Sequence, residues 1–236
     1  MKTVFLDFDG VLFDTLKEAY IVCRYAYYGT DVLKPVEEDI YSLFYRYKFL
    51  VYNTGQYYYL MRLLEENIKS GDEFISRYRF YMKNREKPPE EEFNKKYAAK
   101  RLDLMKNHLE FWNTLEKPFP FFHEVKKLYE EKRIDIVLVT RKNTFAVKTR
   151  LFQYGLNTDK IYGKEELIKY DKKAKFISEY MKEHNIKSAY FVDDNSNNLI
   201  PCGDYSEIKP LLADWGNIAP DETGMECGEI IKLLAA

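Results

Sequence analysis

The 236-residue sequence has few cysteines, almost no net charge and no long apolar run. Its three cysteines, Cys23, Cys202 and Cys227, are far apart and form no C-x-x-C pair, which argues against a disulfide framework or a zinc site and fits reduced structural thiols. With 37 Lys and Arg against 38 Asp and Glu, the formal net charge is -1. Because no global basic field attracts polyanions, we expect neither nucleic acid nor a membrane surface as a partner.

We also expect no targeting segment in the sequence. The opening residues, MKTVFLDFDG, turn acidic after the sixth position and lack the apolar length of a signal peptide. No run approaches the ~18–20 apolar residues of a membrane span. We therefore expect a cytoplasmic protein, built as one large domain or as a domain with a sizeable insertion.

Short apolar runs that end in polar residues are the clearest pattern in the sequence. They lie at 3–9, 134–140, 188–194 and 209–214. Runs of this kind are typical of buried strands. Segments 144–155 and 172–185 have helical spacing, with Asn143 and Asp171 as candidate N-caps. Strands that alternate with helices predict an α/β fold, with a Rossmann-like parallel sheet and helices on both faces.

The stretch 16–117 contains no comparable strand pattern and is rich in Tyr, Leu, Lys, Arg and Glu at helical spacings. We expect at least three helices in it. Glycine, proline and small polar residues predict breaks near 29–35, 53–56, 69–73 and 87–90. The sequence therefore predicts an α/β core at 1–15 and 118–236, interrupted by a helical domain at 16–117.

Tyrosine is concentrated in this helical domain, because 11 of the 21 tyrosines lie between Tyr20 and Tyr59. Interleaved with basic residues, they could form a stacking surface for bases or sugars. We favour the simpler interpretation that they build the core of the domain. A tyrosine ring supplies apolar area, while its hydroxyl can still reach water.

Two carboxylates one residue apart, Asp7 and Asp9, end the first predicted strand and are followed by Gly10. In extended geometry both side chains project to the same side. Like charges that close together favour a metal ion or a protonated carboxyl. Gly10 allows the backbone to approach a ligand without a Cβ in the way. On this motif alone, an ordinary Asp-Gly turn is an equally good interpretation.

A second acidic pair, Asp193 and Asp194, ends another predicted strand in the segment YFVDDNSNNL. Ligands of such sheets bind beyond the carboxyl ends of the strands. We therefore predict a hard-cation site shared with Asp7 and Asp9, for which Mg²⁺ is the fitting ion. Asn198 would orient these ligands. An EF-hand calcium loop starting at Asp193 is disfavoured, because Asn198 stands where glycine is needed and a strand precedes the loop.

Two further features could serve an anion near these acids. Thr140 and Arg141 end the predicted strand 134–140 and offer a hydroxyl and backbone N–H groups. Lys172 and Lys173 fall in the first turn of a predicted helix, where the helix dipole disfavours cations. This placement suggests that one of the two lysines is there to contact the acids or an anion rather than to stabilise the helix.

Taken together, DFDGV, VLVTR, a lysine ahead of an amphipathic helix and FVDDNSNN resemble the four motifs of the haloacid dehalogenase superfamily, in the expected order. The likeness is to its phosphatase branch with a helical cap, which includes phosphoglycolate phosphatase-like proteins. Residues 213–216, ADWG, add a looser likeness. The motifs are specific for the superfamily and weak for the substrate.

The resemblance implies a Mg²⁺-dependent phosphatase that acts on a small phosphorylated metabolite as a monomer or homodimer. Its nucleophile would be Asp7 and its general acid and base Asp9. Its active-site lysine would be Lys173, with Lys172 as the alternative. The implied phosphoryl-binding residues are Gly10, Thr140, Arg141 and Lys173. The implied Mg²⁺ ligands are Asp7, Asp9 and Asp194, supported by Asp193.

Two other functions remain as alternatives. A phosphosugar mutase of the same superfamily is suggested by DGVLFDT with Thr15, but such mutases usually have a His where this sequence has Ala19. A catalytically inactive interaction module would predict the decay of at least one motif, and none has decayed. Dehalogenation is disfavoured by the second Asp of the D-x-D motif. The cap residues that select the leaving group cannot be identified from the sequence, so phosphoglycolate, phosphosugars and nucleotides all stay open.

Overall fold

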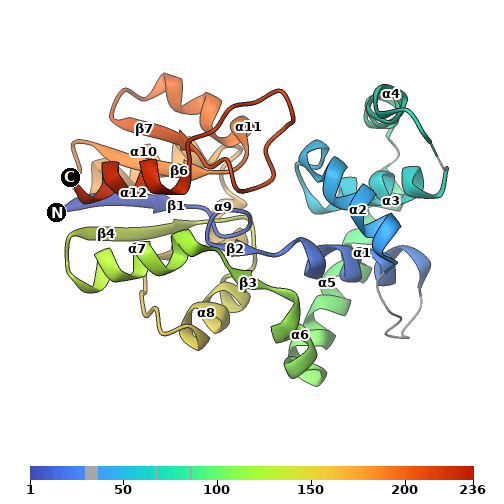
Figure 1. Cartoon of the computed structure of the whole chain (residues 1–236), viewed down its shortest axis with the longest axis horizontal. Coiled ribbons are helices and arrows are strands. Elements are labelled where there is room, and N and C mark those ends of the chain that lie inside the picture. Colours follow the sequence, from blue (N-terminus) through green and yellow to red (C-terminus); the bar gives the residue numbers. More distant parts are fainter. Residues whose placement is uncertain (30–36, 67, 86) are drawn as a thin grey trace. The chain divides into compact units, whose positions relative to one another are not determined.

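The computed structural model describes residues 1–29, 37–66, 68–85 and 87–236 (Figure 1). The chain divides into two compact units. One unit combines Met1–Asp14 with Lys117–Ala236, and the other is Thr15–Glu116. We refer to them as the α/β unit and the helical unit.

The α/β unit is built on a five-stranded sheet with the order β5-β4-β1-β6-β7. Its strands are β1 (Lys2–Leu6), β4 (Ile134–Val139), β5 (Ile161–Tyr162), β6 (Ala189–Asp193) and β7 (Ile208–Leu212). All four strand pairings are parallel, which confirms the predicted fold class. The sequence pattern missed β5, since two residues are too few to show a period.

Helices cover both faces of this sheet (Figure 1). The helices on one face are α7 (Pro120–Glu130), α8 (Thr144–Gln153) and α12 (Cys227–Ala235). The other face is covered by α9 (Lys164–Leu167), α10 (Lys173–Glu183), α11 (Ser196–Leu199) and the 3₁₀ helix η3 (Ile200–Asp204). Successive residues of β1 pack to opposite sides, with Val4 and Leu6 in one core and Phe5 in the other. This alternation explains why the buried strands are apolar at nearly every position.

The ends of α8 and α10 show how local sequence sets the boundaries. The Asn143 side chain caps α8 by accepting a hydrogen bond from Ala146 N, as predicted. The prediction that Asp171 caps the next helix is wrong. Lys172 occupies the N-cap position of α10 in extended geometry and makes no side-chain capping bond, so this helix begins at Lys173.

The helical unit contains six α-helices and two short 3₁₀ helices in its described part. They are α1 (Leu16–Tyr28), α2 (Glu38–Tyr47), η1 (Lys48–Leu50), η2 (Thr54–Gln56), α3 (Tyr57–Glu65), α4 (Gly71–Lys83), α5 (Lys87–Asn107) and α6 (Leu109–Leu115). The prediction of at least three helices is therefore confirmed.

The predicted helix breaks have mixed outcomes. Gly29 ends α1 with a φ of 68°, whereas the rest of the predicted break at 29–35 lies outside the described residues. The break at 53–56 coincides with η2, and the one at 69–73 includes the start of α4. The break near 87–90 is confirmed as a helix boundary, because α4 ends at Lys83 and residues 87–90 form the first turn of α5. Proline is tolerated there, since the first-turn N–H groups have no partner within the helix.

Tyrosines form much of the core of the helical unit. The buried ones are Tyr20, Tyr25, Tyr47, Tyr57, Tyr59, Tyr78 and Tyr97. They pack with Phe44, Phe74 and Trp112. Of the 11 tyrosines between Tyr20 and Tyr59, five are therefore core residues, whereas Tyr28, Tyr45 and Tyr52 are exposed, so the interpretation is confirmed in part.

A two-stranded antiparallel sheet in the α/β unit joins the two ends of the insertion. It consists of β2 (Phe13–Asp14) and β3 (Lys117–Pro118), with Asp14 paired to Lys117. Both connections to the helical unit therefore leave from one place, directly after the Asp7–Asp9 segment.

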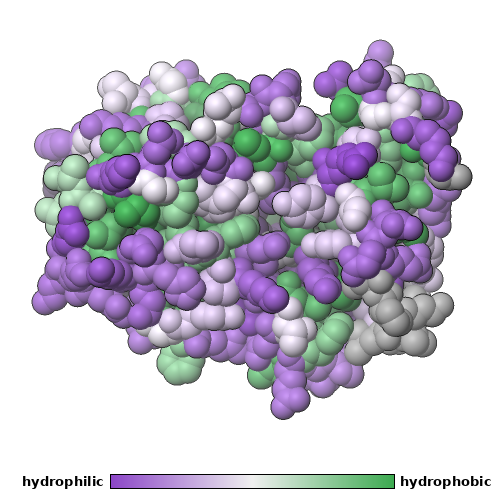
Figure 2. All heavy atoms as spheres, viewed as in Figure 1, coloured by the Kyte–Doolittle hydropathy of each residue, from purple (hydrophilic) through white to green (hydrophobic). Residues whose placement is uncertain are grey.

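In the part of the chain that the structure describes, no helix is both long and apolar enough to cross a bilayer. Figure 2 shows hydrophilic residues spread over the face that it draws, between smaller apolar patches.

Candidate active site

Three strand ends meet at one edge of the parallel sheet. β1 lies between β4 and β6, so the residues that follow these strands are neighbours. Asp7 follows β1 and its backbone N donates to Val192 O at 3.0 Å. Thr140 follows β4 and its N donates to Tyr162 O at 3.0 Å. The side chains predicted to act together therefore start from adjacent positions.

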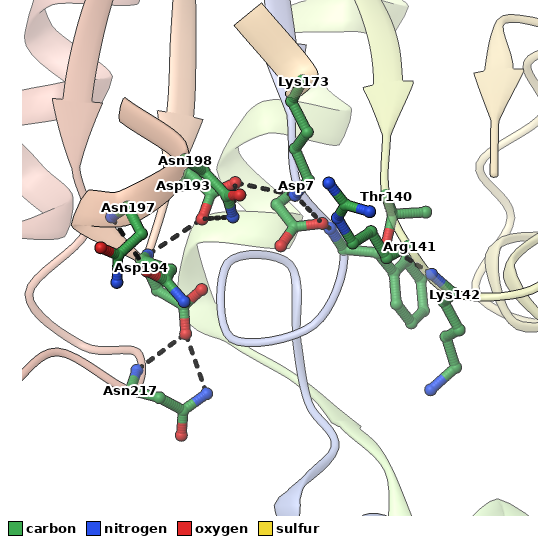
Figure 3. Close-up of polar contacts among 12 residues, drawn as sticks. Asp7, Thr140, Arg141, Lys142, Lys173, Asp193, Asp194, Asn197, Asn198 and Asn217 are labelled. Atoms are coloured by element: carbon green, nitrogen blue, oxygen red, sulfur yellow. Dashed lines mark hydrogen bonds and ion pairs between the residues drawn. The ribbon is translucent and has the colours of Figure 1, made fainter. Parts of the chain in front are cut away.

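An acidic cluster lies at this edge (Figure 3). It consists of Asp7, Asp193 and Asp194, each of which offers a carboxylate oxygen within 4.8 Å of the others. The three residues are buried, with exposed fractions of 7%, 0% and 5%. Three carboxylates this close repel one another unless a cation or a proton lies among them.

A buried cation, Lys173, contacts this cluster. Its Nζ lies 3.0 Å from Asp7 Oδ1 and 2.8 Å from Asp193 Oδ2, and the residue is 3% exposed. The start of α10 carries it to this position (Figure 3). The alternative, Lys172, is exposed at the N-cap position. Of the two lysines considered, the structure brings Lys173 to Asp7.

Burial and like charges shift the pKa of Asp7. This pKa is raised from 3.8 to about 7, first by desolvation and also by the nearby Asp193 and Asp194, against the lowering effect of Lys173. Burial alone would lower the pKa of Lys173, but Asp193 and Asp7 raise it above its ordinary value. Lys173 therefore stays charged, while Asp7 is a carboxyl whose ionised form needs positive charge nearby.

Donors from the protein surround Asp193. Its Oδ1 accepts from Asn195 N at 2.9 Å, and Asn198 Nδ2 lies 3.0 and 3.1 Å from its two oxygens. Lys173 occupies Oδ2 as well. Because both oxygens already accept hydrogen bonds, Asp193 is suited to hold Lys173 and Asn198 in place rather than to bind an ion directly.

Asp194 is held by the loop that follows β7. Asn217 donates to Asp194 Oδ2 twice, from its backbone N and from its Nδ2, each at 2.8 Å. Gly10 packs against the same oxygen: its φ is 81°, and a Cβ there would lie 1.9 Å from Asp194 Oδ2. A Cβ at Gly216 would lie 2.3 Å from Asp194 Cβ. Glycine is therefore required on both sides of this carboxylate.

The carboxylate of Asp9 points to a different partner. Its Oδ1 lies 3.0 Å from Lys142 Nζ, and its side chain is 38% exposed. Asp9 is absent from the acidic group of three that could hold a metal ion among the described residues. The tight turn after it is closed by Gly10 N donating to Phe13 O at 2.8 Å.

The residues after β4 differ in their exposure. Thr140 is 1% exposed, and its Oγ1 accepts from Lys142 N at 3.2 Å. Arg141 is exposed, and its guanidinium donates to Asp171 O at 2.9 Å. Figure 3 shows both residues on the side of Asp7 opposite Asp194.

Sequence reasoning missed two residues of this site, Lys142 and Asn217. Lys142 directly follows the VLVTR motif, but one lysine among 37 basic residues carries no signal by itself. Asn217 directly follows the ADWG segment, and that placement was the only available hint. Both act on residues far away in the sequence, so their partners follow only from the fold.

The assembled site can bind a cation and an anion side by side. Its buried carboxylates suit a hard divalent ion, and Lys173 with the Thr140 hydroxyl suits the oxygens of a phosphate. A carboxylate of raised pKa next to a lysine is also the arrangement expected of a reactive group.

Comparisons with known proteins agree on the architecture. No protein-family model matches the chain, and no curated protein sequence matches it. Solved structures do match over almost the whole chain. A haloacid dehalogenase-like family hydrolase from Streptococcus pneumoniae has a TM-score of 0.59 at 16% identity and covers 99% of this chain and 98% of its own.

Two further structures give the same result. A protein described as a predicted phosphoglycolate phosphatase from Haemophilus somnus has a TM-score of 0.63 at 14% identity, covering 99% of this chain and 97% of its own. A predicted phosphatase from Clostridium acetobutylicum has a TM-score of 0.65 at 17% identity, with coverage of 99% and 97%. The chain therefore has the fold of the haloacid dehalogenase-like hydrolases.

Proposed function

We propose that this protein is a Mg²⁺-dependent phosphatase that hydrolyses a small phosphomonoester through an aspartyl-phosphate intermediate. The observation that carries the proposal is the convergence of Asp7, Asp194 and Lys173 beyond the carboxyl ends of adjacent parallel strands. In this proposal Asp7 is the nucleophile, Asp7 and Asp194 bind the hard cation, and Lys173 supplies positive charge for the phosphoryl oxygens. The likeness of the fold to proteins described as phosphatases supports the same conclusion.

The residues present fit Mg²⁺. Asp7 and Asp194 are carboxylates, the ligand type that Mg²⁺ uses in proteins. Burial and the neighbouring carboxylates raise the pKa of Asp7, so a cation beside it would favour its ionised form. We assign these two side chains as ligands. The predicted role of Asp9 as a further ligand stays a prediction, because its carboxylate contacts Lys142. When bound, Mg²⁺ supplies the positive charge that screens the repulsion between a carboxylate and a phosphate dianion.

The reaction proceeds in two displacements at phosphorus. In the first, a carboxylate oxygen of Asp7 forms a bond to phosphorus as the bond to the substrate oxygen breaks, and Asp9 donates a proton to the departing oxygen. In the second, Asp9 takes a proton from a water molecule that attacks the same phosphorus. The bond to Asp7 then breaks, inorganic phosphate leaves, and Asp7 and the protonated Asp9 are restored.

Four residues hold the phosphoryl group in this proposal. Lys173 contributes its ammonium, Thr140 its hydroxyl and Arg141 a backbone N–H group, while Gly10 allows the backbone to come close. Lys173 has a second task, since its contact with Asp7 favours the ionised, nucleophilic form of that carboxyl. The three free cysteines fit the cytoplasmic setting that we expected from the sequence.

We assign the choice of substrate to the helical unit, acting as a cap. Both of its connections leave from the β2–β3 sheet, and β2 follows the Asp7–Asp9 segment after only three intervening residues. The leaving group itself stays open among phosphoglycolate, phosphosugars and nucleotides.

The direct test is hydrolysis of p-nitrophenyl phosphate with Mg²⁺ and with EDTA, followed by a panel of phosphomonoesters at fixed Mg²⁺. We expect release of inorganic phosphate that EDTA abolishes. Transfer of phosphate between positions of a sugar, without its release, would instead identify a mutase. A folded protein that hydrolyses no member of the panel would be the inactive interaction module, and the proposal would fail.

A further inference from the structure

A second buried lysine of the α/β unit, Lys142, contacts Asp9. Its Nζ lies 3.0 Å from Asp9 Oδ1, and the side chain of the lysine is 1% exposed whereas that of Asp9 is 38% exposed. The ammonium also lies 5.4 Å from the centre of the Phe8 ring. A fully buried cation thus meets a carboxylate that still reaches solvent.

Stability alone is a weak reason for this arrangement. Removing an ammonium from water is costly, and a buried ion pair often stabilises a fold no better than apolar side chains of similar volume. Here the attraction between the two charges is weaker still, because solvent screens the partly exposed carboxylate of Asp9. Methionine could fill the space of Lys142 against Phe8 without that cost. The buried charge is therefore better explained by what it does to Asp9.

The backbone of Lys142 is held on both sides. Its N donates to Thr140 Oγ1 at 3.2 Å, and its carbonyl oxygen accepts from Lys164 N at 2.9 Å. Gly163 makes this approach possible, since a Cβ there would lie 2.8 Å from Lys142 O. The backbone of the lysine is consequently fixed, and the burial of its side chain leaves that side chain little room to move.

The two residues after Lys142 are anchored as well. Glu165 accepts hydrogen bonds from Thr144 N at 3.0 Å and Thr144 Oγ1 at 2.8 Å, and Asn143 Nδ2 donates to the same carboxylate. The segment that presents the ammonium is therefore tied to the start of α9 over its whole length. A rigid support of this kind is what the precise placement of a catalytic group requires.

We propose that Lys142 is a positioning residue for Asp9, which it holds in the orientation for proton transfer to the leaving group. This inference rests on the proposed phosphatase function. The two buried lysines then have different roles. Lys173 contacts Asp7 and binds the phosphoryl group, whereas Lys142 orients Asp9, the general acid. Figure 3 shows the Lys142 side chain extending away from Lys173, in keeping with separate tasks.

The proposal makes a chemical distinction between substrates. A leaving group that forms a stable anion, such as p-nitrophenolate, departs without help from an acid. Phenolate is a poorer leaving group of nearly the same size, so phenyl phosphate depends more on Asp9. If Lys142 acts through Asp9, its loss must harm the second substrate more than the first.

The experiment compares kcat and KM of purified full-length variants on p-nitrophenyl phosphate and phenyl phosphate at saturating Mg²⁺. In Lys142→Met we expect kcat on phenyl phosphate to fall about 10-fold further than on p-nitrophenyl phosphate, a part of the ~10²–10⁴ that general acid catalysis contributes. KM should change little. Asp9→Asn should show the same selectivity more strongly, and adding Lys142→Met to it should have little further effect.

Two variants control for a merely structural role. Lys142→Arg keeps the charge, so its selectivity should return toward that of the wild type. Lys160→Met removes another Lys–Asp contact, 2.6 Å to Asp135, and should leave the ratio of the two kcat values unchanged.

The results separate this inference from the function on which it rests. A wild type that hydrolyses neither ester with Mg²⁺ removes the phosphatase itself. An active wild type with a folded Lys142→Met variant that loses both activities equally, or neither, overturns the role of Lys142. If Lys142→Met fails to fold, Lys142→Arg decides, because selectivity as strong as in Asp9→Asn despite the retained charge would contradict positioning by the ammonium.

Discussion

The two units of this chain bury charged side chains in different ways. The α/β unit gathers them at one edge of its sheet, where two of three buried carboxylates, those of Asp7 and Asp193, share Lys173. The helical unit buries Glu18 completely and pairs it with Arg101, whose Nε and Nη2 lie 2.6 Å from its two oxygens. The first arrangement has three carboxylates and one lysine. In the second, one carboxylate pairs with one guanidinium through two hydrogen bonds.

This is the difference expected between the active site that we propose and a structural contact. A matched pair satisfies both partners, and Arg101 also bonds to Tyr97 Oη at 2.6 Å, so nothing further is needed. The acidic edge instead contains a carboxyl, Asp7, whose pKa burial raises to about 7. An unbalanced buried cluster destabilises the fold unless a ligand completes it. Variants at the two places should therefore have opposite consequences for activity and stability.

The largest expected effect is on turnover at the acidic edge. Asp7→Asn should lower kcat by several orders of magnitude, toward the ~10⁶-fold that loss of an essential nucleophile causes in another hydrolase. Its melting temperature should stay the same or rise, because the change removes one of three repelling carboxylates. Steady-state kinetics measures the loss of turnover, and thermal unfolding measures the melting temperature. Asp135→Asn, at the Lys160 contact, is the matched control and should keep normal turnover. Near-normal turnover in folded Asp7→Asn would rule out this nucleophile.

At the matched pair, the expected effect is on stability. Glu18→Ala should lower the free energy of unfolding by about 3 kcal/mol, since it leaves Arg101 without its buried partner. Urea unfolding followed by circular dichroism measures this loss. Replacing Arg101 by Met in the same protein should recover part of it. A loss below ~1 kcal/mol would mean that the pair behaves like a solvent-exposed one, and the contrast between the units would disappear.

Metal binding sharpens the comparison within the acidic edge. Asp194→Asn should weaken Mg²⁺ binding by roughly 100-fold, because a direct carboxylate ligand is lost, and Asp193→Asn by only ~10-fold, because that residue orients others. Thermal shift against Mg²⁺ concentration gives both affinities independently of activity, and turnover against Mg²⁺ gives a second readout. The order of the two defects is decisive. A larger defect in Asp193→Asn would reverse their roles, and full activity in EDTA would reject the metal mechanism.

Much of this edge could be predicted from the sequence, because the parallel topology alone brings the ends of neighbouring strands together. Once 3–9, 134–140 and 188–194 are recognised as neighbouring buried strands, their carboxyl ends must meet. Asp7 and Asp194 could be placed together in that way without any knowledge of side-chain packing. The register of α10 further favoured Lys173, and its contact with Asp7 shows why burial distinguishes it from Lys172.

The rest depended on contacts that no local pattern encodes. Lys142 is directed to Asp9 by the Gly163 and Glu165 segment, and Asn217 reaches Asp194 from a loop that lacks regular structure. The wrong N-cap at Asp171 has a related cause, since an acidic residue before a helix need not cap it. Propensity identifies elements, whereas these partners are set by how distant segments pack.

The smallest expected effect concerns the tyrosine-rich core of the helical unit, which differs most from the Val-, Ile- and Leu-rich core of the other unit. Tyr47 is 7% exposed and stacks on Phe74 at 3.9 Å between ring centres. Among the described residues its hydroxyl makes no hydrogen bond, so Tyr47→Phe should change the free energy of unfolding by less than about 0.5 kcal/mol. Tyr81 differs, because its hydroxyl donates to Glu66, and Tyr81→Phe should cost about 1 kcal/mol.

Urea unfolding of the two variants tests whether these tyrosines serve as apolar area or as polar groups. Both lose one hydroxyl from the same helical unit, so the difference between them isolates the hydrogen bond. We expect the smaller loss of stability in Tyr47→Phe, because the ring of Tyr47 supplies its packing and its hydroxyl adds no hydrogen bond among the described residues. If Tyr47→Phe costs more than Tyr81→Phe, the hydroxyl of a core tyrosine has a task of its own.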